Sequence, residues 1–180
     1  MLPLIILALS LAVPALTRPA AGIAQRFLCE RSYLNFAWGY QHFGIYVDRD
    51  GDVYRFRIGP GGYRKHPSGP TLTEKELDDK YGDKRTRVRT LSADEVRAML
   101  ALIPAAAKGQ FSTKVSRSRD AGSWSSACYL FDPSNQTYRE IELDVEGDWT
   151  YRNLAPEAAQ LHAWLSALAQ NEKAAEAARE

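Results

Sequence analysis

The sequence predicts an α+β fold: a single domain with a mainly antiparallel sheet of about five to seven strands, built from hairpins, and two or three helices packed on one face. Three observations support it. Hairpin turns join alternating apolar stretches, two helix starts share one capping pattern, and the helical stretches are too irregularly placed for a repeated βαβ unit. The length of 180 residues suits one well-buried domain and is too short for two.

The first hairpin is predicted around Asp50-Gly51, because this dipeptide is favoured in two-residue turns. Folding the chain there places Ile45 opposite Phe56 and makes one face of the hairpin wholly apolar. The opposite face then carries polar and charged side chains: Tyr46, Asp48, Arg55 and Arg57.

Glycine and proline are frequent in residues 59–70, which predicts a loop. Two helix starts follow this loop, because a Ser or Thr stands three residues before a Glu at two places, Thr73 with Glu76 and Ser92 with Glu95. The first helix is expected to end near residue 82 and the second before residue 104, a proline.

Shorter patterns predict the remaining elements. In chain order they are a strand with one basic face at 85–90, a weaker strand at 111–115, a hairpin of 124–131 with 137–145, a strand at 149–152 and a helix that begins at Pro156. Residues 171–180, rich in Ala and Glu, either extend this helix or fray.

Composition and charge exclude several classes of protein. Hydrophobic residues make up 45% and charged residues 25% of the chain, which is typical of a globular protein rather than of a disordered, collagen-like or coiled-coil chain. Lys and Arg (23) nearly balance Asp and Glu (22), so no strong field favours a nucleic acid or an anionic membrane. We therefore expect no nucleic-acid partner.

An apolar run at residues 2–16 is interpreted as the core of a signal peptide that spans residues 1–24. The run is shorter than the roughly 20 residues of a membrane-spanning helix, and small residues suited to cleavage follow it. A buried N-terminal strand or helix is the alternative. Cleavage before Gln25 leaves a domain at 25–170, a tail at 171–180 and no transmembrane segment. We expect the mature chain to be periplasmic or secreted.

The two cysteines, Cys29 and Cys128, are predicted to form a disulfide, because an exported chain folds in an oxidising compartment. Closing a loop of roughly 100 residues would stabilise the domain by up to about 4.7 kcal/mol. Two separate buried thiols are the alternative for a cytosolic chain. Two cysteines are too few for a disulfide-dense scaffold or a four-cysteine zinc site.

The sequence contains no linear motif for catalysis, cofactor binding or metal binding. It lacks the nucleophile elbow, the phosphate-binding loop and the paired-histidine zinc motif. Asp48, Asp50 and Asp52 have the spacing of a calcium loop, but the glycine and glutamate required later in such a loop are missing. We therefore predict no catalytic residue, no cofactor and no metal site.

A basic surface is the candidate binding site. Arg55 and Arg57 share one strand face, and the arginines at 85, 87 and 89 share another. If these strands are neighbours, their guanidinium groups line one face of the sheet and suit planar carboxylate or phosphate groups. A solvated face that pairs with nearby acids is the alternative. The candidate residues are Tyr46, Arg55, Arg57, Arg85, Arg87 and Arg89.

These features favour an exported bacterial envelope protein that acts as a non-catalytic binding or inhibitor-type module, with an anionic protein or a cell-envelope ligand as its partner. The excess of Arg over Lys is typical of a GC-rich bacterial genome. One alternative is an envelope hydrolase whose site is assembled from Asp120, His66 and a serine at 123–126. The other is a purely structural envelope component.

Overall fold

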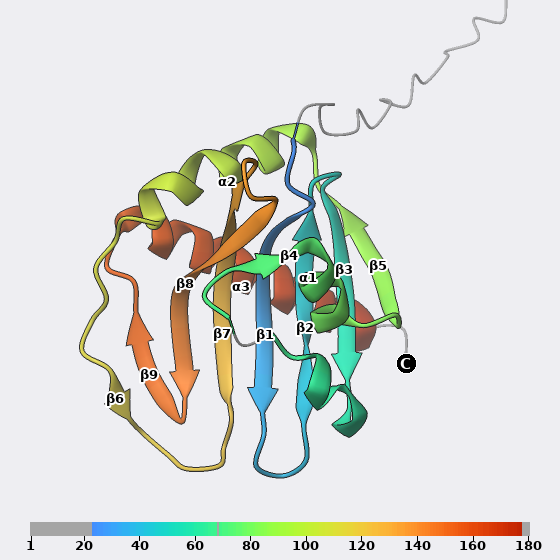
Figure 1. Cartoon of the computed structure of the whole chain (residues 1–180), viewed down its shortest axis with the longest axis vertical. Coiled ribbons are helices and arrows are strands. Elements are labelled where there is room, and N and C mark those ends of the chain that lie inside the picture. Colours follow the sequence, from blue (N-terminus) through green and yellow to red (C-terminus); the bar gives the residue numbers. More distant parts are fainter. Residues whose placement is uncertain (1–22, 68, 178–180) are drawn as a thin grey trace, which may run out of the picture.

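The chain has the predicted α+β architecture in its computed structural model, which describes residues 23–67 and 69–177 (Figure 1). These residues form a sheet of nine strands, three α-helices and a short 3-10 helix. The strand count exceeds the predicted five to seven because two of the strands are only two residues long. The predicted signal peptide, residues 1–24, lies outside the described residues except at its last two positions.

The sheet is mainly a row of antiparallel hairpins. Its strands are β1 (Phe27–Asn35), β2 (Gln41–Asp48), β3 (Asp52–Ile58), β4 (Leu72–Thr73), β5 (Arg85–Thr90), β6 (Val115–Ser116), β7 (Ser123–Asp132), β8 (Thr137–Gly147) and β9 (Trp149–Arg152). Their order in the sheet is β5-β3-β2-β1-β7-β8-β9-β6, and β4 pairs with β8. The prediction of a strand at 111–115 is wrong for most of this segment. Phe111 makes one isolated bridge, and the strand β6 begins only at Val115.

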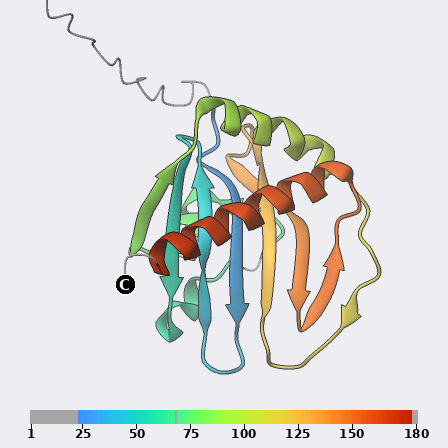
Figure 2. The same cartoon turned by 180° about the vertical axis from the view of Figure 1, so that it is seen from behind.

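The helices cover both faces of the sheet. They are the 3-10 helix η1 (Pro60–Lys65) and the α-helices α1 (Glu74–Tyr81), α2 (Ala93–Ala106) and α3 (Pro156–Ala177). Figure 1 shows α1 on the face toward the viewer, and Figure 2 shows α2 and α3 together on the other face. We call these the front and the back face. The predicted packing of two helices on one face is confirmed, and α1 is the helix that lies apart.

Both predicted helix starts are confirmed. Thr73 caps α1 by accepting the backbone N–H of Glu76, and the Glu76 carboxylate accepts the backbone N–H of Thr73 in return. Ser92 and Glu95 form the same reciprocal pair at the start of α2. At the other end of the chain, α3 extends through the predicted tail as far as residue 177.

The predicted end of the second helix, before Pro104, is wrong. Helix α2 continues through Pro104 to Ala106. Pro104 lies in the last turn of the helix, where its missing N–H removes one hydrogen bond near an end that is already only partly bonded. Burial of Ile103 and Ala106 against the sheet favours the helical continuation.

The first hairpin forms where predicted, but its register differs by one residue. Gly51 has a φ of 78°, and its N–H donates to the carbonyl of Asp48 at 3.0 Å. The loop is therefore a three-residue turn that ends in a left-handed glycine, not a two-residue turn. Ile45 lies opposite Arg55 as a result, and not opposite Phe56. Because side chains alternate along a strand, this shift moves Phe56 to the other face.

Each face of the sheet has its own core. The back core is mainly aliphatic and joins the sheet to α2 and α3, with residues such as Val47, Val53, Ile103, Leu161 and Leu165. The front core is mainly aromatic and joins the sheet to α1 through Phe27, Tyr46, Phe56, Leu72, Leu77, Tyr81, Tyr129 and Tyr138. Two buried faces anchor the central strands, and these strands position the site described below.

The predicted disulfide between Cys29 and Cys128 is confirmed. The two residues lie directly opposite each other on β1 and β7, with a Cα–Cα distance of 3.9 Å and a sequence separation of 99. Both cysteines are fully buried in the back core. The bond therefore links the N-terminal and C-terminal halves of the sheet at its centre.

Candidate functional site

A cavity of about 890 Å³ opens over the front face of the sheet, beside α1. Its lining comes from β1, β2, β4, β7, β8, β9, α1 and nearby loops, and includes Glu30, Ser32, His42, Lys80, Ser125 and Glu142. We call this cavity the groove. Its volume lies within the range of about 300–1,000 Å³ that is common for small-molecule sites.

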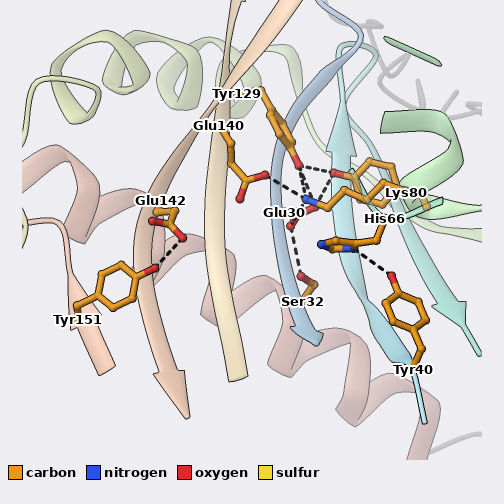
Figure 3. A network of polar contacts seen from close by, with 10 residues as sticks. Glu30, Ser32, Tyr40, His66, Lys80, Tyr129, Glu140, Glu142 and Tyr151 are labelled. Atoms are coloured by element: carbon orange, nitrogen blue, oxygen red, sulfur yellow. Dashed lines mark hydrogen bonds and ion pairs between the residues drawn. The ribbon is translucent and has the colours of Figure 1, made fainter. Parts of the chain in front are cut away.

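Small side chains create the hollow of the groove. Ser32 of β1 lies directly opposite Ser125 of β7, so two short side chains meet at the middle of the sheet. Larger residues flank them: Figure 3 shows Tyr151 on one side of this region and His66 on the other. The contrast in side-chain size along the front face leaves the space open.

A buried ion network lies at the α1 end of the groove (Figure 3). Lys80 of α1 is 5% exposed and Glu30 of β1 is 1% exposed. The Nζ atom of Lys80 donates to Glu30 Oε1 at 2.9 Å, to Tyr129 Oη at 2.9 Å and to Glu140 Oε2 at 3.2 Å. An ammonium has three N–H donors, and each has an oxygen acceptor here.

Hydroxyl groups complete the surroundings of the Glu30 carboxylate. Tyr81 and Tyr129 donate to Oε2 at 2.6 and 3.1 Å, and Ser32 donates to Oε1 at 3.3 Å. With the Lys80 bond, each carboxylate oxygen accepts two hydrogen bonds. Hydrogen bonds of this kind compensate the loss of water around a buried charge.

The network keeps Glu30 and Lys80 charged. Burial disfavours the ionised form of Glu30, but the Lys80 ammonium and the hydrogen bonds from Tyr81 and Lys80 outweigh it and lower the pKa of Glu30 to about 2. Burial also disfavours the Lys80 ammonium, yet Glu140 and Glu30 raise its pKa above the usual value. Burial raises the pKa of Glu140 despite the nearby ammonium.

Two histidines lie beside this network and are uncharged at neutral pH. Burial lowers the pKa of His42 to about 3 and that of His66 to about 4. His66 Nδ1 is 3.0 Å from Tyr40 Oη. The Nδ1 atom of His42 is buried and has no hydrogen-bond partner within residues 23–67 and 69–177.

The opposite end of the groove combines a carboxylate with aromatic rings. Tyr151 donates to Glu142 Oε1 at 2.8 Å, and burial together with this carboxylate raises the pKa of Tyr151. The Nζ atom of Lys114 lies 4.8 Å from the ring centroid of Trp149 and 5.0 Å from that of Tyr151. Both distances are within the range of a cation–π interaction.

The predicted arginine residues do not form one surface. Strands β3 and β5 are neighbours, but Arg55 lies opposite Thr86 while Phe56 lies opposite Arg85. Arg55 is therefore on the other face from Arg85, which shares the front face with Tyr46 and donates to its hydroxyl at 3.1 Å. The pairing of β3 with β5 sets this separation, whereas the shifted hairpin register separates Arg55 from Tyr46.

Acidic residues pair with the three arginines of β5. The pairs are Arg85 with Asp78 at 2.6 Å, Arg87 with Asp52 at 3.1 Å and Arg89 with Glu95 at 3.7 Å. The guanidinium of Arg57 lies 4.4 Å from the ring centroid of Phe43. Partner binding by Tyr46 and the arginines stays a prediction. A partner on one face of the sheet would contact only some of these residues, because they lie on both faces.

The residues of the hydrolase alternative are only partly brought together. Asp120, His66, Ser123 and Ser125 all line the groove. However, the described residues contain no hydrogen bond between His66 and a serine, and the known partner of His66 is Tyr40. This geometry lacks the bond by which a histidine activates a serine nucleophile.

A serine and a histidine do meet on the back face. Ser126 Oγ is 3.1 Å from His162 Nδ1 and accepts a hydrogen bond from Arg31 at 2.9 Å. Ser126 is fully buried between the sheet and α3. A nucleophile needs access to substrate, so we interpret this pair as part of the packing.

The sequence analysis missed the ion network, although one signal for it was present. Leu77, Lys80 and Tyr81 fall on the same face of α1, because helix residues three and four apart are neighbours. A lysine on the apolar face of a short amphipathic helix indicates a buried charge with a partner. No local pattern identifies Glu30 as that partner, because it lies 50 residues away along the chain.

The groove offers no cluster of metal ligands. Among the described residues, no three His, Cys, Asp or Glu side chains lie close enough to hold one metal ion. The same part of the chain contains no helix with the length and apolar character needed to cross a membrane.

Comparisons with protein-family models, with characterised proteins and with solved structures find no match to this chain.

Proposed function

We propose that this chain is an exported bacterial envelope protein that binds a small polar ligand in the groove without transforming it. The observation that carries the proposal is the groove itself, a hollow of about 890 Å³ on the front face of the sheet whose walls combine polar and apolar side chains. Concave sites of this size with a few fixed polar groups are typical of ligand-binding proteins.

The walls of the groove are held in place before any ligand arrives. Lys80 and Glu30 are fixed by their ion pair and by tyrosine hydroxyls, and Glu142 is oriented by Tyr151. The disulfide joins β1 to β7 beneath the floor. Side chains that are already ordered lose little entropy on binding, which favours affinity.

The disulfide also supports the proposed export. Structural disulfides persist in oxidising compartments such as the periplasm and are rare in the cytosol. The test of export is expression of the full chain in a Gram-negative host, followed by fractionation and mass spectrometry. We expect a periplasmic chain that starts at Gln25 and has no free thiol. An uncleaved cytosolic chain with two free thiols would contradict the proposal.

The test of the binding site uses a fragment library and amide chemical shifts measured by NMR. We expect polar fragments to shift the amides of Ser32, Ser125 and Glu142. The variant Ser125→Trp fills the floor of the groove and should abolish these shifts, whereas Ser134→Trp, in the exposed β7–β8 turn, should not. Fragments that bind equally well to both variants would refute the groove as the site.

The hydrolase alternative is tested separately, because Asp120, His66 and Ser123 line the same groove. A fluorophosphonate probe labels activated serines. We expect no labelled serine in the oxidised protein, since no serine in the described residues bonds to His66. Labelling that disappears in Ser123→Ala or Ser125→Ala would replace the binding proposal with a hydrolase.

A further inference from the structure

The groove carries more negative than positive charge. Lys80 is the one Lys or Arg among its lining residues in the described chain, and both of its histidines are neutral. Its lining contains five carboxylates, those of Glu30, Asp120, Glu140, Glu142 and Asp148. A site with this balance attracts cations and repels anions.

Two of the carboxylates already accept several hydrogen bonds from the protein itself. Glu30 accepts four hydrogen bonds in the ion network. Asp148 accepts from the Ser118 hydroxyl and from two backbone N–H groups in the loop before β7. Glu140 and Glu142 have a different arrangement, because the known bonds of each involve one carboxylate oxygen. Their second oxygens suit a ligand.

His42 gives an independent reason to expect a hydrogen-bond donor. It is 1% exposed and lines the groove, and its Nδ1 has no partner in the described residues. The His42 ring is neutral, so one of its nitrogens carries a lone pair, and Nδ1 is the acceptor in the tautomer protonated at Nε2. A buried acceptor without a donor is unfavourable, so a ligand N–H at this point is favoured.

The arrangement suits an extended organic cation better than a metal ion. No three acidic or imidazole side chains of the described chain converge on one point, so the negative charge is spread along the groove. A metal ion needs several ligands at about 2–2.6 Å. A flexible chain with separated ammonium groups can meet separated carboxylates.

Lys114 shows that one end of the groove accommodates an ammonium group. Its Nζ lies 4.8 Å from the Trp149 centroid and 5.0 Å from the Tyr151 centroid, and both rings line the groove. Tyr151 also bonds to Glu142. Aromatic faces next to a carboxylate are a common environment for alkylammonium groups.

We infer that the ligand of the groove is an extended organic cation whose primary ammonium groups bind Glu140 and Glu142 and donate an N–H to His42. This inference rests on the proposed function and specifies the class of its ligand. A free polyamine and the lysine side chains of a peptide present the same chemistry.

The test measures dissociation constants of the oxidised mature protein by calorimetry, with amide shifts to locate the site. The probes are cadaverine, spermidine and trilysine, and glutarate serves as a dianion of similar length to cadaverine. We expect the cations to bind in the groove and glutarate not to bind. Tighter binding of spermidine assigns a free polyamine, and tighter binding of trilysine assigns a peptide.

Variants test the residues. Glu142→Gln and His42→Gln should each weaken cation binding about tenfold, which corresponds to the loss of one charge-assisted hydrogen bond. Lys114→Ala removes an ammonium group of the protein that competes for the same aromatic rings, so it should strengthen cation binding. Asp94→Asn removes an exposed carboxylate of α2, on the back face, and should change nothing. Thermal melting of each variant verifies that it is folded.

The inference is overturned if glutarate binds as tightly as cadaverine, or if a folded Glu142→Gln variant keeps the wild-type affinity. It is also overturned if fragments bind in the groove but the three amines do not, and in that case the proposed binding function stands. If neither fragments nor amines shift any amide of the groove, the proposed function fails as well.

Discussion

Lys80 of α1 and Glu30 of β1 form an ion pair of 2.9 Å, although 50 residues separate them and both side chains are buried. The pair connects the short helix on the front face to the central strand of the sheet. It also forms one end of the groove. The stability of the domain and the shape of the proposed site therefore depend on the same contact.

Breaking this pair from one side should destabilise the protein strongly. The variant Lys80→Met keeps the length of the side chain but leaves Glu30 as a buried charge without its ammonium. We expect the free energy of unfolding to fall by about 3–5 kcal/mol. Urea unfolding followed by tryptophan fluorescence measures the change.

The same helix supplies a matched control. Lys75 pairs with Asp79 at 2.6 Å, but its side chain is 81% exposed. The variant Lys75→Met should leave the urea midpoint almost unchanged, because exposed ion pairs contribute little. Equal effects of Lys75→Met and Lys80→Met would contradict the importance of burial for the ion network.

The fold was largely predictable from local chemistry, whereas the groove was not. The capping pairs at Thr73 and Ser92 and the hairpin positions are encoded within a few residues, and the structure confirms them. The register of the first hairpin depended on whether Gly51 ends a two-residue or a three-residue turn, and both turns suit the sequence. That choice decided which face of the sheet Arg55 and Arg57 occupy.

The groove depends on contacts between segments that are distant in the sequence. Its floor opposes Ser32 to Ser125, and its ion network joins β1, α1, β7 and β8. From the local sequence, serines in strands are predicted to be exposed to solvent, since nothing near them in the sequence indicates a cavity. Only the strand order, with β1 beside β7, brings them together.

Removal of the disulfide should destabilise the domain without unfolding it at 25 °C. Cys29→Ala with Cys128→Ala deletes a bond across 99 residues, and we expect a loss of about 2–5 kcal/mol. Chemical denaturation with and without dithiothreitol measures it. The reductant should destabilise the wild type to a similar extent and leave the double variant unaffected. A wild type that is insensitive to dithiothreitol in denaturant would indicate that the bond is not formed.

Gly44 is predicted to tolerate no side chain, because β1 and β2 approach closely there. A Cβ at this position would lie 2.2 Å from the Arg31 carbonyl oxygen and 2.6 Å from the Ser32 Cα, and backbone atoms cannot easily move away. We expect Gly44→Ala to lower the free energy of unfolding by about 1–3 kcal/mol or more. Gly61→Ala is the control, since no atom lies within 4 Å of its Cβ position.

Acid should destabilise the protein through the buried histidines His42 and His66 before it protonates Glu30. Burial lowers the pKa of His42 to about 3, so the unfolded state, with its usual value near 6.5, binds the proton more readily. The contribution of neutral His42 to the free energy of unfolding is complete above pH 6.5 and is lost as the pH falls toward 3. Glu30, with a pKa of about 2, adds a loss of the same sign below about pH 4.5.

Two variants separate this effect from other titrations. His42→Gln removes the titrating ring, so its unfolding free energy should change less between pH 6.5 and 4.5 than that of the wild type. Asp48 affects the stability in the opposite direction. Burial raises its pKa to about 6, so its protonation in the folded state adds stability as the pH falls from about 6 to 4. Asp48→Asn should therefore steepen the loss. Urea unfolding at half-unit pH intervals measures all three slopes, and a His42→Gln slope equal to that of the wild type would show that His42 is not the group that titrates.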